Sequence, residues 1–177
     1  MGPPGGGRNA VTYRYLRHYN CIALVPYNNA GLSGIFGTIM GHWMSQLSGT
    51  VKAMKNTLVT ATIDVFEKVQ LGLLPTPLKS HYTFNLRDVS KVFQGICQGD
   101  PNSLTESGDM VRLWAHECAR VFQDRLTIQP DIAWFDELLV KMCKQHFNMS
   151  WESVKDGNEN RLLFCNFSDP NNIKKPY

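Results

Sequence analysis

The sequence lacks any long apolar run and any large excess of charge. No stretch approaches the roughly 18 consecutive apolar residues that a membrane-spanning helix needs, and no basic region followed by an apolar signal core opens the chain. The 18 basic and 15 acidic side chains leave a formal net charge of +3, and the basic residues are spread along the chain. We therefore expect neither a membrane nor a nucleic-acid partner.

Cysteines are few and widely separated. The five cysteines form no CxxC pair; they are Cys21, Cys97, Cys118, Cys143 and Cys165. An odd number of separated cysteines indicates reduced core thiols of an intracellular protein. His116 and Glu117 begin an HExxH pattern, but Arg120 stands where the second histidine is needed. We therefore expect no metal site.

The residues that bind and cleave a nucleoside triphosphate are also missing. A P-loop ends in Gly-Lys-Ser/Thr, because the lysine contacts the phosphates and the hydroxyl holds magnesium. Here Gly7 is followed by Arg8 and Asn9, and Walker A and Walker B segments are absent. We therefore predict no catalytic residue, no cofactor and no ATPase activity for this chain alone.

The amino-terminal stretch 1–20 combines a proline-glycine loop, Gly2 to Gly7, with arginines. Consecutive glycines lose much entropy on ordering, so such a loop is kept where the backbone turns sharply or approaches something closely. Arg14 and Arg17 follow it and can present planar guanidinium groups to phosphate oxygens of another segment or subunit. The alternative is a mobile tail with solvated arginines.

Most of the chain has the apolar period of helices with one buried face. This period predicts helices over 31–47, 50–71, 86–96, 107–126 and 130–147. The first stripe comprises Leu32, Ile35, Phe36, Ile39, Met40, Trp43 and Leu47. Three glycines in the same segment would allow another helix to pack closely; they are Gly34, Gly37 and Gly41.

The short apolar run CIALVPY, residues 21–27, predicts a buried strand that ends near Pro26. A strand needs partners for its backbone hydrogen bonds, and the chain offers no convincing set before residues 161–167. Most of the corresponding sheet is therefore missing from this chain.

The helix that begins after Asn85 has a capping box, because Asp88 stands three residues after the cap. Arg87 lies in its first turn, where the helix dipole disfavours a cation. Two explanations remain open. Arg87 is either a solvated residue paired with Asp88 or another neighbour, or it is aimed at a bound phosphate.

Three motifs in this order resemble one family. MGPPGGGRNAVTYRYLRHYN, residues 1–20, resembles the sensor-one loop and arginine segment in the third AAA+ module of axonemal dynein heavy chains of the inner-arm type. SHYTFNLRDVSKVFQGI, residues 80–96, resembles the sensor-two helix of that module, and RLWAHECARVFQDRL, residues 112–126, the lid helix after it. The resemblance covers about residues 1–147.

The resemblance implies a mainly α fold, a helical AAA+ lid subdomain of about five helices preceded by the last strand and loop of an α/β core. Residues 1–28 would end that core, residues 29–147 would form the lid, and residues 148–177 would lead toward the next module. In such modules the nucleotide lies between core and lid, so motion of the lid reports the nucleotide state.

The resemblance also assigns site residues. Arg87 would be sensor two and contact the phosphates of its own module's nucleotide. Arg17, with Arg14 as the alternative, would act in trans on the nucleotide of the preceding module. Gly2 occupies the sensor-one position, where other members carry asparagine, so the side-chain amide that positions a water is missing. This departure favours a regulatory nucleotide-binding module.

The parent protein would be an ATP-driven microtubule motor that binds ATP or ADP with Mg²⁺ in the ciliary axoneme, a cytoplasmic and cytoskeletal location. Its partners would be neighbouring AAA+ modules, the microtubule and other dynein chains. An alternative from another class is a free-standing helical protein-protein interaction module, whose helices bury one another and whose arginine segment is a tail.

Overall fold

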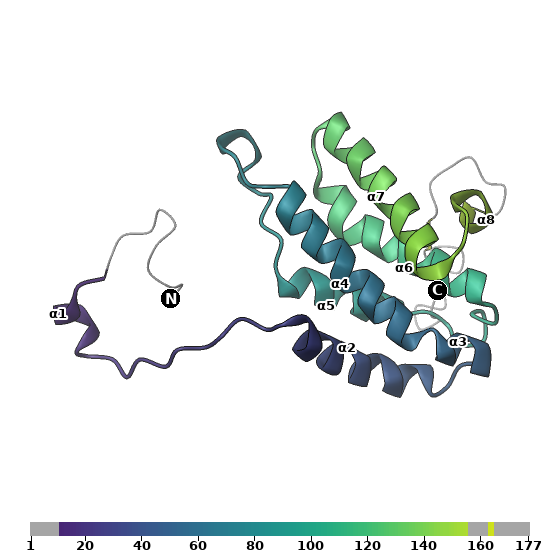
Figure 1. The fold of residues 1–177 in the computed structure, drawn as a ribbon, viewed down its shortest axis with the longest axis horizontal. Coiled ribbons are helices and arrows are strands. Elements are labelled where there is room, and N and C mark those ends of the chain that lie inside the picture. The colour runs from purple at the N-terminus through teal and green to yellow at the C-terminus, as the bar shows by residue number, and fades with distance from the viewer. Residues whose placement is uncertain (1–10, 156–162, 165–177) are drawn as a thin grey trace, which may run out of the picture.

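A computed structural model describes residues 11–155 and 163–164, and in these ranges the regular structure is helical. Helices α2, α4, α5, α6 and α7 form a bundle, and an arm that carries α1 extends away from it (Figure 1). The elements are α1 (Tyr13–Leu16), α2 (Asn29–Met44), α3 (Gly49–Ala53), α4 (Lys55–Gly72), η1 (Pro77–Lys79), α5 (Leu86–Ile96), α6 (Ser107–Phe122), η2 (Gln123–Arg125), α7 (Gln129–Phe147) and α8 (Trp151–Lys155).

The predicted helices are confirmed, with three changes in detail. The helix predicted over 31–47 is α2, which begins at Asn29 and ends at Met44. The segment predicted as one helix over 50–71 is divided at Met54 into α3 and α4. The segment predicted over 107–126 is α6 followed by the 3₁₀ turn η2. Pro130 lies in the first turn of α7, where its missing N–H costs nothing. The local pattern therefore located the helices, and the breaks fall where the chain changes direction.

The core lies between the apolar faces of these helices. In α6 the apolar residues at helical spacing are all buried; these are Met110, Leu113, Trp114, Cys118, Val121 and Phe122. In α2 the predicted stripe is too wide, because Ile35 and Ile39 remain 43% and 50% exposed. α2 packs at the edge of the bundle with a narrow ridge that includes Phe36, which stacks on Phe93 of α5 with ring centroids 4.6 Å apart.

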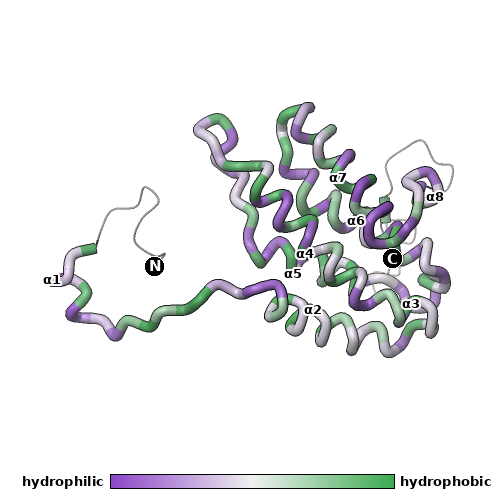
Figure 2. The backbone as a smooth tube through the Cα atoms, viewed as in Figure 1, coloured by the Kyte–Doolittle hydropathy of each residue, from purple (hydrophilic) through white to green (hydrophobic). Residues whose placement is uncertain are grey.

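The strand predicted over 21–27 does not form in this chain. Residues 20–28 have no regular structure, and Ile22, Leu24 and Val25 are more than four-fifths exposed. Figure 2 shows this apolar stretch in the arm between α1 and α2. The described residues include no other strand with which it could pair. A lone strand leaves its backbone groups without partners, so this part of the prediction is wrong for the chain by itself.

Glycines permit close packing at other places than those predicted. Side chains added at Gly34 or Gly37 would meet nothing within 4 Å, and one at Gly41 would meet the side chain of Lys55 at 3.5 Å. A Cβ at Gly95 in α5, in contrast, would overlap the carboxylate of Glu117 in α6. α5 and α6 therefore make a close contact at Gly95.

The loop between α4 and α5 contains η1 and is held against the start of α7. The Lys79 ammonium donates to Asp131 Oδ2 at 2.6 Å, and the buried Tyr82 hydroxyl donates to the same oxygen at 2.9 Å. The hydrogen bond from Lys79 is the main reason why the pKa of Asp131 is lowered from its usual 3.8. The loop is thus held in a defined position at the end of the bundle from which α5 starts.

Two of the five cysteines that the sequence predicted to be core thiols lie in the core. Cys118 and Cys143 are fully buried. Burial raises the pKa of the Cys143 thiol to about 12, and burial, with a smaller effect of Cys143, raises the pKa of the Cys118 thiol well above its usual range. The prediction is wrong for Cys21, which is exposed on the arm, because the arm does not pack on the bundle. Cys97 is partly buried, and Cys165 lies outside the described residues.

Candidate functional site

The first turn of α5 is held in place by the hydrogen bonds of its N-cap. The Asn85 side chain accepts a hydrogen bond from the Arg87 amide at 2.8 Å, and the Asp88 carboxylate accepts one from the Asn85 amide at 3.0 Å. This is the capping box that the sequence predicted. It fixes the backbone around Arg87 and leaves the Arg87 side chain exposed at the end of the helix.

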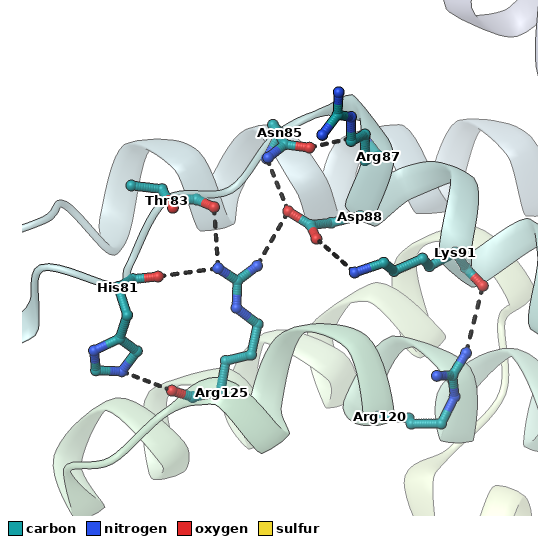
Figure 3. A network of polar contacts seen from close by, with 8 residues as sticks. All are labelled: His81, Thr83, Asn85, Arg87, Asp88, Lys91, Arg120 and Arg125. Atoms are coloured by element: carbon teal, nitrogen blue, oxygen red, sulfur yellow. Dashed lines mark hydrogen bonds and ion pairs between the residues drawn. The ribbon is translucent and has the colours of Figure 1, made fainter.

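Asp88 does not pair with Arg87. Its carboxylate is almost fully buried and lies 3.1 Å from Nη1 of Arg125 and 3.8 Å from Nζ of Lys91 (Figure 3). In the described part of the chain no carboxylate lies within ion-pair distance of Arg87. Of the two explanations for Arg87, pairing with Asp88 is therefore excluded.

Arg125, in η2 at the end of α6, holds the segment that enters α5. Its Nη2 donates to the carbonyls of His81 and Thr83 at 3.0 and 3.1 Å, and its own carbonyl lies 3.0 Å from Nε2 of His81. The guanidinium also lies over the Phe84 ring, 4.9 Å from the centroid. One side chain thus joins the end of α6 to the loop, to an aromatic core residue and to Asp88.

A second arginine, Arg120, joins α6 to α5 one turn further along. Its Nε and Nη2 donate to Oε2 of Glu117 at 2.8 and 2.5 Å, and Nη2 lies 3.5 Å from the Lys91 carbonyl. Glu117 is fully buried beneath Gly95, where α5 has no side chain. The pairing explains how a carboxylate is accommodated between two helices, since a buried charge without a partner is costly.

These residues surround a cavity of about 400 Å³ at the start of α5. Its lining comprises Thr83, Asn85, Arg87, Asp88, Lys91, Arg120, Val121 and Arg125. Basic side chains predominate, because Asp88 is the only acid among the lining residues and it is already engaged by Arg125. Such a surface attracts anions, and guanidinium groups match phosphate or carboxylate oxygens in geometry.

The other predicted site residues lie elsewhere. Arg14 is in α1 and Arg17 follows it; both are exposed on the arm, which Figure 1 shows apart from the bundle. The Arg17 side chain donates to His18 at 3.3 Å and, within residues 11–155, pairs with no carboxylate. Gly2 lies outside the described residues. The structure therefore does not bring the amino-terminal arginines to Arg87.

The sequence analysis singled out Arg87 but missed three basic residues around it: Lys91, Arg120 and Arg125. A local signal was available for two of them. Lys91 follows Arg87 by one helical turn, and Arg120 follows Glu117 at the i,i+3 spacing of a helix ion pair. Arg125 has no such signal, because its partners lie 37 to 44 residues earlier in the chain.

No metal site is evident in the described ranges, since no three histidine, cysteine or acidic side chains gather there. Equally, no helix in these ranges is long and apolar enough to cross a membrane. The basic side chains that line the cavity are suited to bind an anion.

A family model described as the AAA+ lid domain matches residues 58–156. The chain belongs to the AAA+ lid domain family. The matched range begins inside α4 and contains the whole basic cavity. The helical lid that the sequence led us to expect is thereby confirmed.

The chain is also similar to axonemal dynein heavy chains. It is 41% identical to dynein axonemal heavy chain 1 of Homo sapiens over its full length, and 43% identical to dynein axonemal heavy chain 6 of Homo sapiens over 84% of its length. It is 37% identical to dynein axonemal heavy chain 12 of Mus musculus over 96% of its length. The chain spans only 4% to 6% of the length of these relatives.

Proposed function

We propose that this lid belongs to the third AAA+ module of an inner-arm axonemal dynein heavy chain and senses the phosphates of a bound nucleotide through Arg87. The parent would be an ATP-driven microtubule motor of the ciliary axoneme, a cytoplasmic and cytoskeletal location. Similarity to three axonemal heavy chains supports this parentage. In this proposal residues 1–28 complete the module's core, residues 29–147 form its lid and residues 148–177 lead to the next module.

The observation that carries the proposal is the free guanidinium of Arg87. It stands in the first helical turn beside other cations, and no acid in the described residues neutralises it. This arrangement is unfavourable for the isolated lid, because like charges and the positive end of the helix dipole oppose it. A bound phosphate would relieve the repulsion, since its oxygens accept from the guanidinium and lie at the end of a helix that favours negative charge.

The ligand would be ATP or ADP with Mg²⁺, held by the core of the parent module. The lid residues would not carry out the chemistry, since phosphoryl transfer depends mainly on positioning and charge neutralisation. Arg87 would instead pull the start of α5 toward the phosphates when they are present. Because α5 packs on α6 along its length, the whole lid would follow as a rigid body.

The arm supplies a second role in this proposal. Arg17, with Arg14 as the alternative, would reach the nucleotide of the preceding module of the same heavy chain. Their exposure and their lack of acidic partners in the described ranges support this assignment. The other partners of the parent would be the microtubule and other dynein chains. Gly2 in place of the sensor-one asparagine favours nucleotide binding over hydrolysis at this module.

Pyrophosphate titration of the chain tests the role of Arg87. Backbone amide resonances should shift at the start of α5, and Arg87→Ala should weaken the affinity about tenfold, as the loss of a charged hydrogen bond implies. Lys52→Ala in α3 is the control, because it removes an exposed cation outside the cavity. Equal loss in both variants, or no binding at all, would refute the phosphate-sensing role.

The alternative, a free-standing interaction module, is favoured by one observation. Leu71, Leu74 and Leu78 around the end of α4 are 79%, 62% and 92% exposed, as on a surface that contacts another protein. The mass of the native polypeptide in its source cells, detected with an antibody against residues 148–177, separates the two proposals. A single very large band supports a heavy chain, whereas a band near 20 kDa, the mass of this chain, supports the interaction module.

A further inference from the structure

Arg125 stands out in the cavity because its contacts point inward to the protein. Its guanidinium is engaged by the Asp88 carboxylate at 3.1 Å and by the carbonyls of His81 and Thr83 at 3.0 and 3.1 Å (Figure 3). Its side chain is only 32% exposed. Arg87, in contrast, has an exposed side chain at the same cavity. The two arginines therefore differ in their contacts and in their exposure to solvent.

Asp88 links Arg125 to the position of Arg87. The same carboxylate oxygen, Oδ2, accepts from the Asn85 amide and lies against Arg125. Asn85 in turn accepts from the Arg87 amide. A chain of contacts thus runs from η2 through Asp88 and Asn85 to the backbone of Arg87. The contacts use two different nitrogens, since Nη1 faces Asp88 and Nη2 donates to the two carbonyls. Lysine has a single terminal nitrogen, which cannot occupy both positions at once.

We propose that Arg125 is a positioning residue, which fixes the turn that carries Arg87 and passes any displacement of that turn on to α6, without binding the anion itself. This inference rests on the proposed function, in which Arg87 contacts a phosphate. In addition, Arg125 would link the contact between Arg87 and a phosphate to a movement of α5 and α6 together. The Glu117–Arg120 pair, which reaches the Lys91 carbonyl, supports the same connection one turn further along.

The geometry distinguishes positioning from simple attraction of charge. Arg125→Lys keeps the positive charge but cannot reach Asp88 and both carbonyls together. If Arg125 only attracted the anion, this variant would bind almost normally. If Arg125 fixes the turn, the variant should bind about as weakly as Arg125→Ala, with the number of ionic contacts to the ligand unchanged.

Hydrogen exchange provides a readout that needs no ligand. The amides of Asn85 and Arg87 are both protected by the capping box. Arg125→Lys should raise their exchange rates about tenfold, in proportion to the loss of a hydrogen bond to a charged group. Arg87→Ala should leave them unchanged. Asp88→Asn, a second variant of similar size, should raise them as well and should add little to Arg125→Lys, because both changes break the same contact.

Arg112→Lys is the matched control. Arg112 lies near the other end of α6, pairs with Asp109 at 2.7 Å and donates to the Val154 carbonyl at 3.0 Å. Asp109 is itself the third residue of a capping box, so the local arrangement is like that of Asp88 and Arg125. Its replacement should lower the melting temperature by a similar amount but leave the Asn85 and Arg87 amides protected.

Pyrophosphate binding to the full chain then completes the test. Arg125→Lys should weaken binding about tenfold while the slope of log affinity against log salt concentration stays that of the wild type, because the number of ligand-contacting charges is the same. Arg87→Ala should reduce that slope. Unchanged exchange in Arg125→Lys, or faster exchange with full affinity, would overturn the positioning role. No binding by the wild-type chain would refute phosphate sensing, and exchange alone would then decide whether Arg125 fixes the turn.

Discussion

Replacing Gly95 by alanine should destabilise the lid, although alanine is the better helix former. Gly95 lies inside α5, and an added Cβ would overlap the Glu117 carboxylate of α6. Glu117 is fully buried and held by Arg120, so its carboxylate can move aside only by giving up that pairing. Either the two helices separate or the ion pair breaks.

The magnitude follows from two opposing effects. Alanine gains up to about 1 kcal/mol over glycine in a helix interior. Forcing an extra methyl group into a packed contact costs about 1–3 kcal/mol, and disrupting a buried carboxylate pair adds to that cost. The cost of overpacking should therefore exceed the gain in helix propensity, and the free energy of unfolding should fall by about 1–3 kcal/mol. For a domain of this size the melting temperature should fall by roughly 3–10 °C.

Thermal unfolding followed by circular dichroism measures the effect, and Gly34→Ala is its control. Gly34 is also inside a helix, but nothing lies within 4 Å of its added Cβ. That variant should gain up to about 1 kcal/mol and melt a few degrees higher. The same substitution at two helical glycines should thus change stability in opposite directions.

A double mutant identifies the cause. In a Glu117→Ala background the carboxylate that Gly95→Ala would meet is gone, so the second substitution should be nearly neutral or stabilising. If Gly95→Ala raises the melting temperature as Gly34→Ala does, the close approach of α5 to α6 is refuted. If it destabilises equally in both backgrounds, Glu117 is not the obstacle.

Three further predictions concern other parts of the chain. A thiol reagent should label Cys21 quickly and Cys118 and Cys143 only after unfolding, as mass spectrometry of pulse-labelled samples would show; early labelling of either buried thiol would contradict the core. Because the pKa of Asp131 is lowered in the folded state, the ionised carboxylate stabilises the fold above the carboxyl's usual pKa of 3.8. This stabilisation is lost as the pH falls through the folded-state pKa of Asp131. Asp131→Asn should therefore flatten the acid side of a stability-against-pH curve, and an unchanged curve would argue against the ion pair. Deletion of residues 1–26 should shift the melting temperature by less than about 2 °C, because residues 11–26 bury almost nothing, and a larger fall would show that the bundle depends on the arm.

Local features of the fold were predictable from the sequence. The capping box at Asn85 and Asp88 depends on a spacing of three residues, and the stripe of α6 depends on one helix period. The width of the α2 stripe was not predictable, because the exposure of Ile35 depends on where neighbouring helices end. Residues 21–27 have the composition of a strand, but a strand forms only with partners that this chain does not show.

The candidate site was predictable only where its features depend on residues close together in the sequence. Arg87 was identifiable because its place in the first turn conflicts with the helix dipole. Asp88 was identified as a capping residue, but its ion pair with Arg125 joins residues 37 positions apart and appears only when α5 and α6 pack. Gly95 resembles Gly34 in sequence, and only the opposite helix distinguishes them.

The exposed arm sets a limit on distance. Between Arg17 and Asn28, where α2 is capped, the backbone can span at most about 40 Å even when fully stretched. The arm is thus a tether of limited length between Arg17, which lies outside the bundle, and α2. In the proposed function, a movement of the lid that exceeds the spare length of the arm would pull Arg17 with it. One polypeptide would then relate the nucleotide state of its own module to that of the preceding module.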